Sequence, residues 1–144
     1  MNHKKEVYPN LSKTDFATCI SGGLNRLSRK IDGIYRKNLK PFEITVSQLN
    51  ILSTVGQFWE MEQSQVGKVL MMERSTVSRD LKRLIKRGLI HQSGRVNRRL
   101  LTISQEGAIF LENIIPFWEK AMQESSTLLG EKGVKDLGAI QQRL

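Results

Sequence analysis

Hydroxyl and arginine side chains recur at helical spacing between residues 74 and 87. Ser75, Thr76 and Ser78 are short, so a backbone that carries them can come close to DNA, and their hydroxyls can bond to phosphate. Arg79, one turn further, can donate two parallel hydrogen bonds to O6 and N7 of a guanine in the major groove. These residue types at this spacing predict a helix whose N-terminal half contacts base edges.

Three groups of side chains complete the predicted DNA-binding surface. Lys82, Arg83 and Lys86 lie further along the same helix and are expected to meet phosphates, which position a protein without specifying sequence. A basic loop follows, and its arginines can enter a narrow minor groove. The full set is Arg74, Ser75, Thr76, Ser78, Arg79, Lys82, Arg83 and Lys86 on the recognition helix, Ser64 and Gln65 on the helix before it, and Arg95, Asn97, Arg98 and Arg99 in the loop.

The elements that position this surface follow from apolar spacing. A helix over 63–70 with Glu62 as its cap, a turn at 71–73 and a helix over 74–87 form a helix-turn-helix. Gly88 suits the left-handed residue after the last turn. Strands over 89–92 and 100–103, joined by the loop 93–99, add a wing. The predicted inward positions are Val66, Val69 and Leu70 on the first helix and Val77, Leu81, Leu84 and Ile85 on the second.

Further helices flank this region. One is expected from Leu11 to Leu39, with Ser12 and Asp15 as a capping box and Gly22-Gly23 as an interruption. Another starts at Thr45, which forms a capping box with Gln48, and ends near Gly56. After Ser104 a long helix is expected to about Leu128, kinked at Pro116, and a last helix over 132–144.

The predicted fold class is mainly α with a small β-wing: a winged helix-turn-helix core plus long N- and C-terminal helices. The predicted domains are an N-terminal helix in 1–40, the DNA-binding region in 41–104 and C-terminal helices in 105–144. The flanking helices carry more apolar surface than one small helix pair needs, which indicates an interface between copies. These positions are Phe16, Ile20, Leu24, Phe110, Ile114, Phe117, Trp118, Val134, Leu137 and Ile140.

Charge and composition narrow the class of protein. The 144 residues carry a net charge of +9, and residues 74–99 alone hold nine basic side chains and one acidic one. Such a local excess predicts a nucleic-acid partner. One cysteine excludes an intramolecular disulfide framework and suits a cytoplasmic location. Neither a run of about 18 apolar residues nor an apolar stretch after Met1–Glu6 occurs, so neither a membrane span nor a secretory signal is expected.

The ordered set of motifs resembles the MarR family of bacterial transcription regulators. The matching stretches are Ile44-Thr45-Val46-Ser47-Gln48-Leu49, Glu62-Gln63-Ser64-Gln65-Val66-Gly67, Arg74-Ser75-Thr76-Val77-Ser78-Arg79, Arg87-Gly88-Leu89-Ile90, Asn97-Arg98-Arg99 and Leu101-Thr102-Ile103-Ser104-Gln105-Glu106-Gly107. The resemblance implies a homodimer that binds a pseudo-palindromic operator, commonly as a repressor. The family usually has Asp where this chain has Asn97, so the carboxylate that would brace a wing arginine is missing.

The resemblance also implies two ways to sense a signal. Many relatives release DNA when a small aromatic or phenolic ligand binds, and the candidate lining here is Ile31, Tyr35, Phe42, Phe58, Trp59, Met71, Met72 and Trp118, although such residues are more often plain core. Some relatives sense hydroperoxides through one cysteine, for which Cys19 is the candidate, although a lone cysteine is more often inert.

Catalysis finds little support in the sequence. The two histidines, His3 and His91, form no metal-binding pair, and no nucleophile elbow or phosphate-binding glycine loop occurs. We therefore expect no enzyme activity, no cofactor and no metal site, and His91 is expected to face solvent from a strand. Two other classes stay open: an architectural DNA-binding protein with little base specificity, and a scaffold that dimerises through its long helices.

Overall fold

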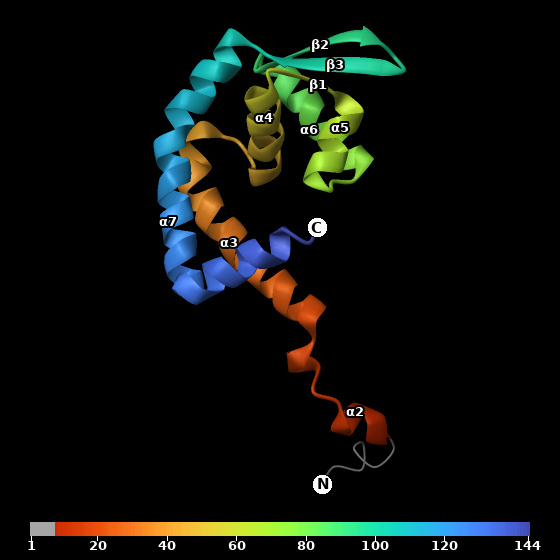
Figure 1. Ribbon diagram of the computed structural model, residues 1–144, viewed down its shortest axis with the longest axis vertical. Coiled ribbons are helices and arrows are strands. Elements are labelled where there is room, and N and C mark those ends of the chain that lie inside the picture. Colours follow the sequence, from red (N-terminus) through yellow and green to blue (C-terminus); the bar gives the residue numbers. More distant parts are fainter. Residues whose placement is uncertain (1–7) are drawn as a thin grey trace. The chain divides into compact units, whose positions relative to one another are not determined.

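The computed structural model describes residues 8–144 and shows helices with one small sheet (Figure 1). The chain forms two compact units, Met1–Gly33 and Ile34–Leu144, and their boundary falls inside helix α3. The predicted fold class, mainly α with a small β-wing, is confirmed. The expectations for Met1–Glu6 and His3 lie outside the described residues.

The N-terminal segment is not the single helix predicted from Leu11 to Leu39. It forms α2 (Pro9–Lys13), a 3-10 turn η1 (Phe16–Thr18) and α3 (Ile20–Leu39). The break follows from Asp15, whose carboxylate accepts the backbone N–H of Ala17 at 2.9 Å and caps η1. The predicted Ser12 cap is also wrong, because the Ser12 hydroxyl donates to the carbonyl of Pro9. By contrast, α3 continues through Gly22-Gly23 without interruption.

The central helices begin and end close to the predicted residues. They are α4 (Val46–Phe58), α5 (Gln63–Leu70) and α6 (Arg74–Lys86). The capping box at the start of α4 is confirmed: Thr45 Oγ1 accepts the Gln48 backbone N–H at 3.1 Å, and Gln48 Oε1 accepts that of Thr45 at 3.3 Å. Gly88 has φ 73°, as the predicted helix end requires.

The core of the second unit lies where α4 packs against α5, α6, α7 and strand β3. The inward positions predicted for Val66, Val77, Leu81 and Leu84 are confirmed, since each is at most 3% exposed. The prediction for Val69 is wrong, because this side chain is 57% exposed on the outer face of α5. Leu70 and Ile85 are partly buried against the core.

The wing is longer and its loop tighter than predicted. Strand β1 (Glu60–Glu62), which the sequence analysis missed, joins β2 (Ile90–Arg95) and β3 (Arg98–Ile103) in the order β1-β3-β2. Pairing continues to Arg95 opposite Arg98, so the predicted loop 93–99 shrinks to a turn at Val96-Asn97. Gly94 makes this possible: its φ is 88°, and a Cβ there would lie 2.3 Å from the carbonyl oxygen of Arg98.

The C-terminal helix α7 (Gln105–Gln141) starts at the predicted cap, since Ser104 Oγ accepts the backbone N–H of Gly107 at 2.9 Å. Its dihedral angles stay helical through Pro116. The change of direction comes instead at Gly130 (φ 70°, ψ 164°), which ends the first straight part (Figure 1). Two residues predicted at an interface belong to the core: Ile114 is 1% exposed, and Phe110 packs against the core.

Candidate nucleic-acid interface

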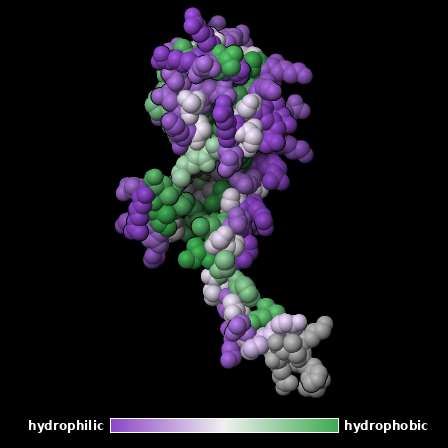
Figure 2. All heavy atoms as spheres, turned by 90° about the vertical axis from the view of Figure 1, so that its right-hand side faces the viewer, coloured by the Kyte–Doolittle hydropathy of each residue, from purple (hydrophilic) through white to green (hydrophobic). Residues whose placement is uncertain are grey.

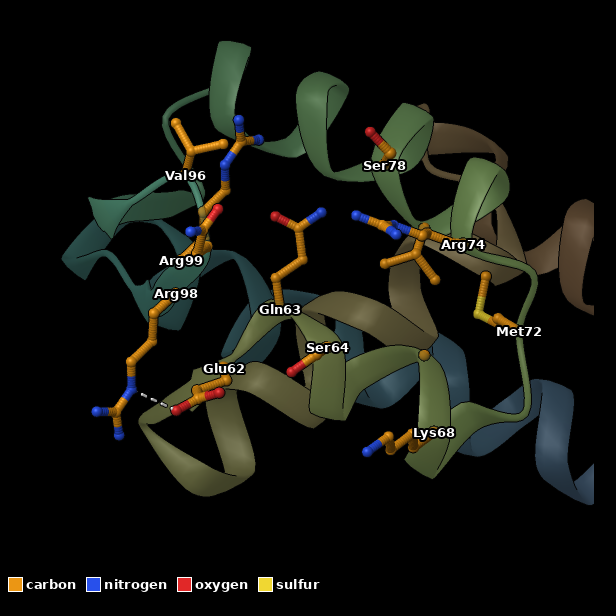
Figure 3. A pocket seen from close by; sticks show the side chains of 13 residues that line it. Glu62, Gln63, Ser64, Lys68, Met72, Arg74, Ser78, Val96, Arg98 and Arg99 are labelled. Carbon is orange, nitrogen blue, oxygen red and sulfur yellow. Dashed lines mark hydrogen bonds and ion pairs between the residues drawn. The ribbon is translucent and has the colours of Figure 1, made fainter.

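A groove lies between α5, the start of α6 and the wing. It encloses about 580 Å³ and brings together six of the predicted DNA-binding residues: Ser64, Arg74, Ser78, Asn97, Arg98 and Arg99. Figure 3 shows Gln63 and Ser64 of α5, Arg74 and Ser78 of α6 and Arg99 of the wing around this groove. The arrangement places amide, hydroxyl and guanidinium donors around one concave surface, which suits an anionic partner.

The exposed face of α6 continues outward from the groove. Ser75, Arg79 and Lys82 are exposed on it, whereas Thr76 and Ser78 are partly buried. The opposite face of α6 packs against the core through the buried side chains of Val77, Leu81 and Leu84. An α-helix with one buried stripe and a basic, hydroxyl-bearing outer face has the shape and charge that the major groove of DNA accepts.

Arg83 and Lys86 do not join the groove. With Thr45 and Gln48 they line a separate, shallow hollow of about 360 Å³. Arg83 Nη1 lies 3.6 Å from the carboxylate of Asp80 on the preceding turn. These two basic residues therefore sit at the far end of α6, where we expect phosphate contacts rather than base contacts.

Two charged residues of this region serve the fold, and the sequence analysis missed both roles. Asp80, 5% exposed, accepts the Ser47 hydroxyl at 2.5 Å and so joins α6 to α4.

Arg87 donates to the carbonyl oxygens of Phe42 (3.0 Å) and Glu43 (2.9 Å), and its guanidinium lies 5.1 Å from the ring centre of Phe110. Arg87, one of the nine basic residues of 74–99, therefore contacts groups of the protein itself. No spacing rule would have found this role of Arg87, because the two carbonyl groups that it contacts lie more than 40 positions away.

The wing is tied to the start of α5 by two side-chain contacts. Arg98 Nε donates to Glu62 Oε1 at 2.7 Å, and Gln92 Nε2 donates to Gln63 Oε1 at 3.0 Å. Within residues 8–144, Arg98 is the one wing arginine with an ion-pair partner. Arg95 and Arg99 are exposed on β2 and β3. Gln65, predicted to face DNA, is exposed, and its side-chain oxygen accepts the backbone N–H of Glu62 at 3.0 Å.

The predicted ligand-binding residues do not gather around one cavity. Met72 alone lines the groove, while Phe58, Trp59 and Met71 are more than half exposed. Phe42 packs edge-on against Phe110 and Phe117 in the core region. Burial raises the pKa of the Tyr35 hydroxyl above its ordinary value of 10.0. Trp118 is 39% exposed on α7, and Ile31 is partly buried on α3.

The structure also places Cys19, the candidate redox sensor, and His91. Cys19 is exposed at the end of η1, and His91 is exposed in β2. Within residues 8–144, no cluster of three His, Cys, Asp or Glu side chains could hold a metal ion. In the same part of the chain, none of the helices has the length and apolar character needed to cross a membrane.

Comparisons with known proteins agree with this geometry, which is that of a winged helix-turn-helix protein. The MarR family model matches residues 44–101, which cover most of the winged helix-turn-helix region. The resemblance noted in the sequence is thereby confirmed. No curated protein sequence matches the chain.

Solved structures show the same fold at low sequence identity. BpsR of Bordetella bronchiseptica, described for the regulation of its DNA binding by 6-hydroxynicotinic acid, has a TM-score of 0.82 at 20% identity, covering 90% of this chain and 96% of that one. A probable transcriptional regulator from Pseudomonas aeruginosa has a TM-score of 0.80 at 21% identity, with 90% and 98% covered. A MarR mutant from E. coli complexed with operator DNA has a TM-score of 0.78 at 20% identity, again with 90% and 98% covered.

Proposed function

We propose that this protein is a sequence-specific, DNA-binding transcriptional regulator that binds a pseudo-palindromic operator as a homodimer. The observation that carries the proposal is the continuous surface formed by the outer face of α6 and the groove toward the wing, with Ser75, Arg79 and Arg99 exposed or lining it. The MarR-family match and the DNA complex of a structural relative support it. The proposal includes a repressor role in the cytoplasm and no catalytic activity.

The homodimer is supported by apolar side chains on α7. Trp118 and Met122 lie one helical turn apart and are about 40% exposed, as are Leu128 and Val134 on the same helix. In Figure 2 polar side chains dominate over the winged helix region, while apolar ones gather at the level of the C-terminal part of α7. Exposed apolar surface of this extent favours association, and a two-fold dimer would present two copies of α6 to DNA.

Selection of bound sequences from random DNA tests the proposal. We expect a palindrome with half-sites about 10–10.5 bp apart, or a multiple of that, because two symmetry-related helices enter successive turns of the major groove. Affinity for the selected duplex should exceed that for a scrambled duplex by roughly 10³–10⁷. Selection that returns no palindrome would favour an architectural DNA-binding protein. Absence of any salt-sensitive binding would contradict DNA binding altogether.

We also propose that a small aromatic acid releases the DNA. The support is the regulation of DNA binding by 6-hydroxynicotinic acid described for BpsR, together with the aromatic and methionine side chains on α3, α4 and α7 of this chain. The test is a titration of the protein bound to its selected duplex with 6-hydroxynicotinic acid and with benzoate, followed by fluorescence anisotropy. Release by either acid, at concentrations where glutamate at equal ionic strength has no effect, supports this part of the proposal; no release by both contradicts it.

A further inference from the structure

The two arginines that flank the tip of the wing, Arg95 and Arg98, differ in what they contact. Arg95, Arg98 and Arg99 are all exposed, but within residues 8–144 only Arg98 has an ion-pair partner, Glu62, the residue before α5. The register explains the contact. Glu62 lies opposite Leu100, so Arg98 is its diagonal neighbour two residues along β3. Figure 3 shows the Arg98 side chain extending toward Glu62, with which it pairs at the edge of the groove.

A second contact acts at the same place. The Gln92 amide of β2 donates to the side-chain oxygen of Gln63, the first residue of α5. Two successive residues at the start of α5 thus hold two strands of the wing. Without them the hairpin tip would depend on its backbone ladder alone, because Val96, Asn97 and the residues around them are exposed.

We propose that Glu62 is a positioning residue for the wing: it holds Arg98 away from the nucleic acid and thereby sets the angle at which Arg95, Asn97 and Arg99 meet the minor groove. This inference rests on the proposed DNA-binding function. Glu62 supplies, from another element, a carboxylate that braces the wing, while Asn97 itself has only a neutral amide. Arg98 is then a structural residue of the wing rather than a DNA contact.

The salt dependence of DNA binding distinguishes this role from a direct contact. Each phosphate contact adds about 0.9 to the slope of log K against log salt on duplex DNA. If Arg98 is held by Glu62, Arg98→Gln leaves the slope for a mixed-sequence duplex unchanged, whereas Arg99→Gln lowers it. Glu62→Gln frees Arg98 to reach a phosphate, so the slope rises and the ratio of affinities for the selected and scrambled duplexes falls at least tenfold.

Glu60→Gln is the matched control. Glu60 lies on the same short strand, is exposed and changes the net charge by the same amount, but within residues 8–144 it has no ion-pair partner. It should strengthen binding to both duplexes alike. Exchange of the two charges, Glu62→Arg with Arg98→Glu, restores the pair and should recover most of the affinity ratio lost in Glu62→Gln.

The outcomes separate this inference from the proposed function. Arg98→Gln and Arg99→Gln lowering the slope equally would overturn the inference and leave DNA binding intact. Glu62→Gln behaving like Glu60→Gln would overturn it as well. Wild-type protein that binds neither duplex in a salt-sensitive way would overturn the proposed function and the inference with it. Circular dichroism melting of each variant confirms that the compared proteins are folded.

Discussion

Arg79 is the side chain on which base recognition is expected to depend most. It is exposed one turn into α6, at the position from which a guanidinium can reach a guanine edge. Arg79→Ala should weaken binding by about 1–3 kcal/mol and relax the preference at one base pair in each half-site. Binding to a panel of operator duplexes, each with one substituted pair, measures both effects.

Lys82→Ala provides the comparison on the same face of α6. A lysine that contacts phosphate contributes equally to all sequences, so its loss should weaken every duplex alike and reduce the salt slope. If Arg79→Ala also weakened all duplexes equally, Arg79 would be a phosphate contact, and base recognition would have to lie elsewhere on α6.

We expect the loss of the Asp80 side chain to lower the stability of the fold rather than to change base recognition. Its buried carboxylate accepts the Ser47 hydroxyl and lies near Arg83, and its loss leaves the partly buried Ser47 and the buried Gln48 on α4 without this acceptor. Since hydrogen bonds to a charged group contribute about 1.5–3 kcal/mol, Asp80→Ala should lower the free energy of unfolding by about 2–3 kcal/mol.

Asp136→Ala is the control for Asp80→Ala. It removes an exposed ion pair with Lys132 on α7, which at i,i+4 spacing should contribute less than about 0.5 kcal/mol. Urea unfolding at neutral pH measures both variants. Equal, small effects would show that Asp80 does not hold α6 to α4.

At the scale of single residues, the sequence predicted the side of a helix on which a residue lies better than it predicted the residues that it contacts. Periodicity placed Val77, Leu81 and Arg79 on the correct sides of α6, because helix geometry is local. The partners of Glu62, Asp80 and Arg87 could not be predicted, since each lies on a distant segment whose position depends on the folded chain. Asp80 was counted only as one negative charge among nine positive ones, although it is the buried link between two helices.

Among the elements, the connection from α6 through β2 to α7 depends on Ser104. Its hydroxyl donates to the carbonyl of Gly88 at 2.6 Å and accepts the N–H of Gly107, and the side chain is buried. Ser104→Ala removes the α7 cap and leaves the Gly88 carbonyl without this donor. The free energy of unfolding should fall by about 1–2 kcal/mol. Thermal unfolding against Thr127→Ala, an exposed hydroxyl on the same helix, measures the difference.

Elements that begin and end with a local signal were predicted well. Thr45, Gly88 and Ser104 mark their helix ends in sequence and in structure. Strand β1 was missed because three residues are too short for a periodic pattern, and it forms only by pairing with β3. The first helix was extended too far, because the apolar pattern continues across the turn that Asp15 caps.

For the whole molecule, the basic side chains behind the net charge of +9 divide into those on the surface proposed to face DNA and those that contact the protein itself. Arg87 and Arg98 contact groups of the protein itself, so the number of phosphate contacts is smaller than the nine basic residues of 74–99. Outside residues 74–99 the net charge is only +1, because the mildly acidic stretches 45–73 and 100–144 offset most of the positive charge of residues 1–44. In the proposed homodimer, specificity would depend on placing two copies of α6 correctly, so the dimer would be part of the recognition mechanism.

The proposed homodimer leads to a prediction for α7. Trp118→Lys combined with Met122→Lys places two charges on its exposed apolar face, where burial against a second copy would be very costly. We expect the variant to sediment as a monomer and its melting temperature to lose the dependence on protein concentration that a dimer shows. DNA binding should weaken strongly, because a monomer contacts only one half-site.

Val69→Lys is the matched control, because Val69 is equally apolar and 57% exposed but lies on α5. It should leave the sedimentation coefficient unchanged. A dimeric Trp118→Lys, Met122→Lys double variant would show that copies associate through a different surface. A monomeric wild type would contradict the homodimer, and recognition of a palindrome would then require two molecules that meet only on the DNA.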